Sequence, residues 1–295
     1  MGRWQYHLVA FVVVVIWGST FVFTKMLLLN GLSPAQIFTL RFIVAYILMA
    51  AVYHKHWLAR NWRDELLMVA MGVTGGSVYF LAENAAMLYT TATNTSLIVC
   101  SCPLFTMLLV ALVYRHSEHF SKVQVAGSVL ACVGMAVVVL NGQFVLHLSP
   151  QGDLLAFAAC LCWAVYSLFI KSVSHRYSPL FITRKVFFYG LLTILPYYLI
   201  VPGFPTVDML LSPQVLWNLL FLGVVASLLC YLLWNWVIDR LGAVEATNWV
   251  YVNPVSTIVF ARWLLNEQIT PWFLLGTLFI LAGMYLCDRK VKETK

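Results

Sequence analysis

The feature that most constrains this chain is a series of ten apolar runs separated by short polar connections. About 20 apolar residues of helix cross the hydrocarbon core of a bilayer. With 62% hydrophobic and only 10% charged residues, the chain has more apolar surface than one water-soluble core can bury. We therefore expect an all-α integral membrane protein. Its predicted spans are residues 7–28, 34–53, 66–89, 93–114, 123–141, 152–172, 180–201, 213–238, 243–265 and 271–287.

The two halves of the chain repeat the same motif residues. Trp17 and Lys25 recur 146 positions later as Trp163 and Lys171. Further matched pairs are Phe23/Phe169, Gly72/Gly223, Asn84/Asn235, Pro103/Pro254, Glu118/Glu267, Gly127/Gly276, Gly134/Gly283 and Met135/Met284. Because each half holds five predicted spans, an odd number, the second half should enter the membrane upside down relative to the first. Inverted repeats of this kind are typical of secondary transporters.

The charges in the connections predict an orientation. Cations collect in the connections after spans 2, 4, 6 and 8 and in the C-terminal tail, as in proteins that keep Lys and Arg on the cytoplasmic side. These cations are Lys55, Arg60, Arg63, Arg115, Lys122, Arg176, Arg240, Arg289, Lys290, Lys292 and Lys295. The connections after spans 1, 3, 5, 7 and 9 carry no Lys or Arg. We expect two inverted five-helix repeats, residues 1–145 and 146–295, in a bacterial inner (plasma) membrane, with both termini in the cytoplasm.

Several kinds of partner are not expected from this sequence. The net charge is +7, but the chain has no dense basic run interleaved with aromatic residues, so nucleic acid is not an expected partner. The seven cysteines lie in apolar runs without metal-ligand spacing, so we expect no metal and no cofactor. There is no P-loop, so ATP is not the expected driver. The expected partners are a small-molecule substrate and the lipid bilayer, and an oligomeric partner is left open.

Ionisable residues inside predicted spans are candidates for function, because a charge at such depth usually pairs or lines a wet cavity. Arg41 and Glu83 lie at similar depth in spans 2 and 3. Two interpretations stay open: a structural Arg41–Glu83 salt bridge, or a role in binding substrate and coupling protons, centred on Glu83. Further candidates for coupling or charge pairing are Lys25, Lys171, Arg184 and Glu245. Glu245 is placed to meet Lys171 and Arg184 near the cytoplasmic face, but the pattern favours the alternative that these cations snorkel to the membrane surface.

Pro103 and Pro254 lie at equivalent mid-span positions in spans 4 and 9. Proline inside a helix removes a backbone hydrogen bond and bends the helix axis. One such residue is compatible with a simple packing kink. Two at matched positions favour a shared hinge for gating, or an opened backbone at the level of a binding site.

Aromatic and small polar residues at the depth of these prolines are candidate walls of a substrate cavity. Most deep aromatic residues only pack, and most deep polar residues only join helices by hydrogen bonds. The matched pair Trp17 and Trp163 is therefore the stronger part of the prediction. The candidate cavity residues are Trp17, Tyr79, Glu83, Asn84, Thr95, Trp163, Tyr166, Trp234, Asn235, Asn248, Trp249 and Tyr251.

These motifs resemble the drug/metabolite transporter superfamily. The segment W-G-S-T-F-x-x-x-K, from Trp17 to Lys25, is similar to the first-span signature of that superfamily. The run that begins at Tyr251 is similar to the ending of the EamA-type branch, with Pro254, Glu267, Gly276 and Gly283 in the same order. The resemblance covers essentially the whole chain. It implies a ten-helix transporter with a cavity walled by spans 1–4 and 6–9, and with spans 5 and 10 at the periphery.

The second copy of the first-span motif departs from the first. It reads W-A-V-Y-S-L-F-I-K, so Ala164 and Val165 stand where the first copy has Gly18 and Ser19. A symmetric role for this segment is therefore in doubt. The loop residues Glu118 and Glu267 are better placed to cap the next helix than to touch substrate.

We therefore expect a secondary transporter of small polar metabolites, an exporter of amino acids or related compounds that works by alternating access. Proton coupling through Glu83 and facilitated diffusion both stay open. One alternative is an intramembrane enzyme. The histidines of this chain lie only at span ends and in loops, so we expect no catalytic residues. Another is a non-transporting membrane scaffold, against which the paired mid-span prolines argue.

Overall fold

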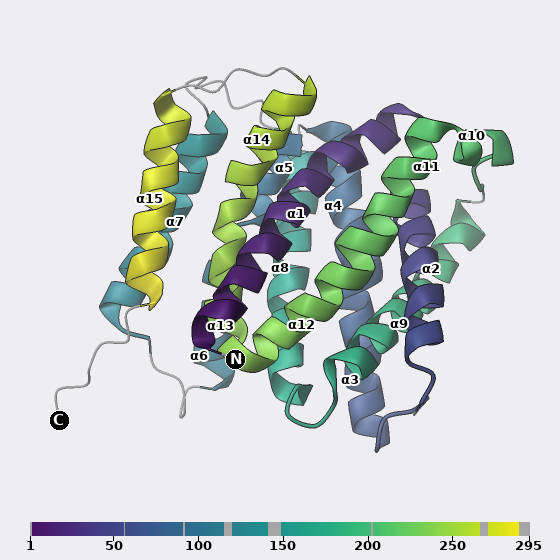
Figure 1. Cartoon of the computed structure of the whole chain (residues 1–295), viewed down its shortest axis with the longest axis horizontal. Helices are drawn as coiled ribbons and strands as arrows, with labels where there is room; N and C mark the ends of the chain where they lie inside the picture. The colour runs from purple at the N-terminus through teal and green to yellow at the C-terminus, as the bar shows by residue number, and fades with distance from the viewer. Residues whose placement is uncertain are drawn as a thin grey trace.

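The computed structural model describes the chain except residues 1, 56, 91, 115–119, 141–148, 202, 266–270 and 289–295, and the described part is helical (Figure 1). The first half contains α1 (Arg3–Leu29), α2 (Pro34–Val52), α3 (Trp62–Gly72), η1 (Val73–Ser77), α4 (Val78–Tyr89), α5 (Ala92–Val99), α6 (Cys102–Val113) and α7 (Lys122–Leu140). The second half contains α8 (Pro150–Val173), α9 (Pro179–Ile200), α10 (Val207–Leu211), α11 (Pro213–Leu220), η2 (Phe221–Leu229), α12 (Cys230–Leu241), α13 (Ala243–Asn248), η3 (Trp249–Val252), α14 (Asn253–Leu265) and α15 (Pro271–Asp288).

These elements group into ten segments that match the ten predicted spans. Six described helices are long and apolar enough to cross a bilayer by themselves: Arg3–Leu29, Pro34–Val52, Trp62–Tyr89, Pro150–Val173, Pro179–Ile200 and Pro213–Leu241. The remaining four segments are α7, α15 and the divided pairs α5–α6 and α13–α14. The short helix α10, in the connection before α11, was not predicted.

Four of the described helices, α2, α8, α9 and α11, begin at a Ser-Pro pair, which helps to keep the connections short. Proline is tolerated in the first turn because the N–H it lacks has no helical partner there. At α2, α8 and α9 the serine before it also accepts a hydrogen bond from a backbone N–H of that turn. At α2 the cap is reciprocal: Ser33 Oγ accepts from the Gln36 N–H (3.2 Å), and the Gln36 side chain accepts from the Ser33 N–H (2.9 Å).

The two halves enter the bundle in opposite directions, as the odd number of spans predicts. In Figure 1, α1 begins and α15 ends at the lower end, while α8 descends toward that end. The predicted boundary between the repeats, at 145/146, lies outside the described residues.

Helices α7 and α15 pack against each other at one edge of the bundle, which confirms the peripheral place expected for spans 5 and 10 (Figure 1). Glycines let their backbones approach closely. A β-carbon on Gly127 would lie 2.7 Å from the carbonyl oxygen of Gly283, and one on Gly134 would lie 2.7 Å from that of Gly276. Gly127 therefore faces Gly283, and Gly134 faces Gly276, so each glycine packs against the repeat counterpart of the other.

Two kinds of interruption divide the long helices. The π-helical turns η1 and η2 lie at matched positions in the third span of each half. Within η1, Gly76 departs from helical geometry (φ −134°, ψ −105°). Spans 4 and 9 are interrupted just before Pro103 and Pro254, each of which lies in the first turn of the helix that follows. Both prolines thus lie where an α-helix begins, a position at which the ring removes no helical hydrogen bond.

We expect Gly283→Leu to destabilise the protein by about 1–3 kcal/mol, the cost of overpacking a tight contact. A β-carbon there would lie 2.5 Å from the backbone of α7. Thermal unfolding in detergent measures the effect. Ala282→Leu is the matched control, because Ala282 is exposed on the same helix and should tolerate the added bulk. Equal melting temperatures for the two variants would contradict this account of the α7–α15 contact.

Candidate functional site

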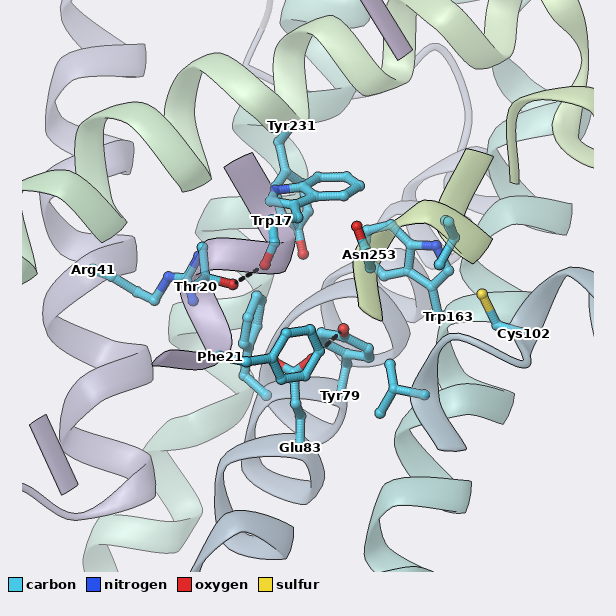
Figure 2. A pocket seen from close by; sticks show the side chains of 13 residues that line it. Trp17, Thr20, Phe21, Arg41, Tyr79, Glu83, Cys102, Trp163, Tyr231 and Asn253 are labelled. Carbon is cyan, nitrogen blue, oxygen red and sulfur yellow. Dashed lines mark hydrogen bonds between the residues drawn. The ribbon is translucent and has the colours of Figure 1, made fainter. Parts of the chain in front are cut away.

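A cavity lies inside the bundle, between elements of both halves (Figure 2). Its volume is about 30 Å³, room for about two water molecules, so a metabolite fits only when the cavity widens. The first half contributes residues of α1, α2, α4, α5 and α6, and the second half residues of α8, α12, η3 and α14. Of the predicted site residues, the cavity brings together Trp17, Arg41, Tyr79, Glu83 and Trp163. Movement of one half against the other would therefore reshape this cavity.

Arg41 and Glu83 line the cavity without pairing with each other. Glu83 Oε1 accepts a hydrogen bond from the Tyr79 hydroxyl (2.6 Å), which lies one helical turn earlier on α4. Arg41 Nε donates to Ser227 Oγ (2.8 Å), and its guanidinium carbon lies 4.5 Å from the centroid of the Phe80 ring. None of the ion pairs among the described residues joins Arg41 to Glu83, so the salt-bridge interpretation is wrong. The remaining donors of the guanidinium and the second carboxylate oxygen are available to a ligand.

Aromatic rings form the wall between these charges. The rings of Trp17 and Trp163 meet edge to face at a centroid distance of 5.2 Å, so the matched tryptophans of the two halves touch. Tyr231 lies 5.9 Å from both, and Tyr79 lies 5.1 Å from Trp163. Trp234 packs against Trp17 (4.9 Å), and its Nε1 has no hydrogen-bond partner in the described part of the chain. Such a wall suits an apolar or aromatic group of a ligand.

The two π-helical turns present backbone carbonyls to this aromatic wall. Trp17 Nε1 donates to the carbonyl oxygen of Ala226 in η2 (2.9 Å). The Tyr231 hydroxyl donates to the carbonyl oxygen of Gly75 in η1 (2.6 Å). Trp163 Nε1 is buried without a hydrogen-bond partner among the described residues. It is one of several buried polar atoms without a partner in the described part of the chain, and leaving a buried donor unsatisfied costs about 1–3 kcal/mol.

Several predicted cavity residues instead join helices by hydrogen bonds. Asn235 accepts from the Tyr166 hydroxyl (2.9 Å) and donates to Thr183 Oγ1 (2.8 Å). Asn84 donates to the carbonyl oxygen of Pro34 (3.1 Å). These residues surround the cavity but do not line it. Their contacts are therefore the interhelical hydrogen bonds that the sequence left open as the alternative to a cavity role.

The predicted residues of span 9 are placed away from the cavity as well. The indole of Trp249 donates to His7 Nδ1 (3.1 Å), and Tyr251 Oη lies 3.8 Å from Cys132 Sγ. The other two predicted residues outside the cavity lining, Asn248 and Thr95, are buried.

Glu245 does not meet the cations with which it was predicted to pair. It binds Arg3 (2.7 Å) and lies 3.2 Å from His7, both in the first turns of α1. Its position in the first turn of α13 faces α1, whereas Lys171 and Arg184 lie on α8 and α9. The expected cluster of Glu245, Lys171 and Arg184 is therefore wrong, because sequence gives depth in the membrane but not position around the bundle.

The other predicted coupling cations also lie outside the cavity lining. Lys25 Nζ donates to the carbonyl oxygen of Met87 (2.7 Å). Lys171 Nζ lies 4.7 Å from the centroid of the Tyr114 ring. Arg184 Nη1 donates to two backbone carbonyls of the connection that follows α2 (2.8 and 3.0 Å). Only Arg41 and Glu83 of the charged candidates face the cavity.

A polar cluster binds the start of α3 to the second half, at the end of the bundle where α1 begins. Asp64, 3% exposed, accepts hydrogen bonds from Arg176 (2.5 Å), the Tyr177 hydroxyl (2.7 Å) and Asn61 (3.0 Å). Burial and the hydrogen bond to the Asp64 carboxylate raise the pKa of Tyr177, so its hydroxyl stays protonated and donating. Next to Asp64, the Glu65 carboxylate binds Lys185 of α9.

Sequence reasoning missed part of the cavity lining. Tyr231 is the counterpart of Phe80 in the repeat, and Asn253 directly precedes Pro254, so both had a signal in the chain. The lining residues that were not predicted are Thr20, Phe21, Phe80, Val99, Cys102, Tyr231, Val250 and Asn253. Among the described residues, no group of three or more His, Cys, Asp or Glu could hold a metal ion.

Comparison with known proteins finds one family along nearly the whole chain. The EamA-like transporter family matches residues 4–140 and 150–287, once in each half. A solved structure described only as the crystal structure of a protein shares the fold, with a TM-score of 0.74 at 18% identity over 97% of each chain.

Similar proteins of known name are transporters. An uncharacterized transporter of Archaeoglobus fulgidus is 27% identical, covering 96% of this chain and 97% of its own. A probable amino-acid metabolite efflux pump of Salmonella typhimurium is 29% identical, covering 94% and 92%. A probable terminal-alkyne amino-acid exporter of Streptantibioticus cattleyicolor is 27% identical, covering 94% and 91%.

We expect Asp64→Asn to destabilise the protein by about 1–3 kcal/mol, because it weakens three hydrogen bonds to a buried carboxylate. The apparent melting temperature in detergent measures this loss. Asp239→Asn is the control, since that carboxylate is 25% exposed and lies 3.6 Å from its neighbour Arg240, so its removal should have little effect. A melting temperature unchanged in both variants would show that the Asp64 cluster does not hold α3 in place.

Proposed function

The chain belongs to the EamA-like transporter family, and from that premise we propose that it exports a small zwitterionic metabolite, an amino acid with an apolar side chain or a close relative. The observation that carries the proposal is the separation of Arg41 and Glu83 in one aromatic cavity. The family assigns the chain to membrane transporters and not to enzymes.

The cavity offers one group for each part of such a substrate. The guanidinium of Arg41 suits a carboxylate, because its planar fork donates paired hydrogen bonds. The carboxylate of Glu83 suits an ammonium group, and the rings of Trp17, Trp163 and Tyr231 suit an apolar side chain. An Arg41–Glu83 ion pair would have neutralised both charges and left no such complement. The names of the Salmonella typhimurium and Streptantibioticus cattleyicolor relatives support the same class of substrate and the outward direction.

Alternating access follows from the inverted halves. The breaks before Pro103 and Pro254 lie in two cavity-lining segments, and we propose that they bend as hinges. The Asp64 cluster joins α3 of the first half to the α8–α9 connection of the second, so it would separate when the cavity opens at that end. The cationic connections and the common end of α1 and α15 support a cytoplasmic location for this end, in an inner membrane.

The first test separates the two charges by matched substrates. In proteoliposomes, we expect export of phenylalanine, and we expect Arg41→Gln to lower its kcat/KM roughly 10- to 100-fold, the cost of one charged hydrogen bond. Phenethylamine, which lacks the carboxylate, should be affected much less by Arg41→Gln than by Glu83→Gln. Asp239→Asn removes a carboxylate outside the cavity and should transport normally. Equal losses for both substrates in the Arg41 variant would contradict the assigned role, and no transport of a broad metabolite panel would favour a scaffold.

The second test concerns proton coupling, for which Glu83 is the cavity carboxylate. If Glu83 binds a proton on the return step, a pH gradient should stimulate export by the native protein. In Glu83→Gln, exchange of labelled for unlabelled substrate should be slower, because the ammonium group loses its partner, and the remaining export should no longer respond to the gradient. Stimulation by the gradient that persists in Glu83→Gln would show that another group couples the protons. No stimulation of the native protein would indicate facilitated diffusion.

A further inference from the structure

The two π-helical turns carry matched carbonyl groups. Gly75 in η1 and Ala226 in η2 occupy equivalent positions, since each lies three residues after the matched glycines Gly72 and Gly223. Both carbonyl oxygens accept a side-chain hydrogen bond from a residue of the aromatic wall. The two halves therefore present the same acceptor at the same place, one in each orientation.

The donors to these carbonyls are not equivalent. Trp17 Nε1 donates to Ala226 O at 2.9 Å, so the repeat predicts that Trp163 Nε1 donates to Gly75 O. The Tyr231 hydroxyl holds that acceptor instead, at 2.6 Å. Trp163 Nε1 is left buried, with no hydrogen-bond partner in the described part of the chain. Of the two equivalent indole–carbonyl bonds, the Trp17–Ala226 bond is formed, and the Tyr231–Gly75 bond takes the place of the other.

The unsatisfied indole packs against the residue that now holds the acceptor assigned to it by symmetry. The Trp163 ring meets the Tyr231 ring at 5.9 Å and 89°. One turn along α8, the ring of Tyr166 packs directly on Gly75, so close that a β-carbon on Gly75 would lie 2.4 Å from it. Helix α8 therefore already contacts η1, and the indole packs against Tyr231, the residue whose hydroxyl holds the carbonyl.

Only one half carries such a competitor. The counterpart of Tyr231 in the first half is Phe80, which has no hydroxyl to offer to Ala226 O. Tyr231 and Trp163 both line the cavity (Figure 2). A rearrangement of the two side chains would therefore change the contacts of a bound substrate.

We propose that Trp163 and Tyr231 exchange at Gly75 O when the cavity changes the side to which it opens, and that Trp17 leaves Ala226 O in the same step. An inverted-repeat transporter reaches its opposite state when each half takes the conformation that the other half had. Trp163 then adopts the bonded geometry of Trp17, and Trp17 adopts the unbonded geometry of Trp163. The hydroxyl of Tyr231 is released into the cavity. This inference rests on the alternating access proposed above.

The exchange makes Tyr231 the residue that sets the balance between the two states. In the present state both carbonyls are bonded, and in the exchanged state only Gly75 O keeps an indole donor. The Tyr231 hydroxyl therefore favours the present state. A variant without it should populate the exchanged state several-fold more, because Gly75 O is then open to the indole of Trp163.

The test uses the full chain in lipid nanodiscs with ¹⁵N-labelled tryptophan indoles. Substitutions Trp17→Phe, Trp163→Phe and Trp234→Phe assign the three Nε1–H signals. In Tyr231→Phe we expect the Trp163 proton signal to move to the position of a hydrogen-bonded indole and the Trp17 signal to move the opposite way. The Trp234 signal should stay, because the residue matched to Trp234 is Glu83 and it has no indole with which to exchange.

Tyr166→Phe is the matched control. It removes another buried hydroxyl from the same ring cluster, one that bonds Asn235 and not a π-turn carbonyl, so it should move neither indole signal. An unmoved Trp163 signal in Tyr231→Phe overturns the proposal. Movement of Trp163 without Trp17 also overturns it, since that would be local repair of one donor. If Tyr231→Phe does not fold, Trp163→Phe should fix the Trp17 signal in its bonded position, and a Trp17 signal that still exchanges would refute the link.

The outcome also separates this inference from the proposed function. Coupled movement of both signals in a protein that exports nothing would overturn the export function and keep the exchange. Export by the native protein, with both signals unmoved in Tyr231→Phe, would keep the export function and overturn the exchange.

Discussion

A charge inside a bilayer must be solvated by the protein itself, and the centre of this structure is built around two charges that do not cancel. Arg41 is held by the Ser227 hydroxyl and by the face of Phe80, and Glu83 by the Tyr79 hydroxyl. Each charge has a neutral partner, so each keeps its sign toward the cavity. A direct ion pair would have been the simpler way to bury them, but it would have closed the site.

The support for Arg41 comes from one of the irregular turns. Ser227 lies in η2, next to the carbonyl that accepts the Trp17 indole, so one π-helical turn holds both the cavity cation and a wall of the cavity. Its counterpart η1 holds Tyr231 in the same way. Since π-turns and prolines interrupt four of the ten spans, the irregular backbone gathers around the cavity, where it can bend or bind.

Much of this architecture could be predicted from the sequence, because hydropathy and loop charge act on whole segments. The ten spans and the inverted halves follow from such signals, and the sequence repeat singled out Trp17 and Trp163, which both line the cavity. The Arg41–Glu83 pairing failed because equal depth says nothing about the direction a side chain takes around its helix. The pairing expected for Glu245 failed for the same reason. The π-turns were missed because their glycines suit close packing equally well.

The mismatches between the halves have two different physical origins. The residue equivalent to Ala164 is Gly18 in the first half, where α1 crosses α14 too closely for a side chain. A β-carbon on Gly18 would lie 2.6 Å from Asn253 O. That mismatch is explained by packing alone. Glu83 against Trp234, and Phe80 against Tyr231, have no such steric cause and change the chemistry of the cavity wall. A symmetric bundle would favour neither direction of opening, so these chemical mismatches are where a bias between the two states, and a preference for one substrate, can arise.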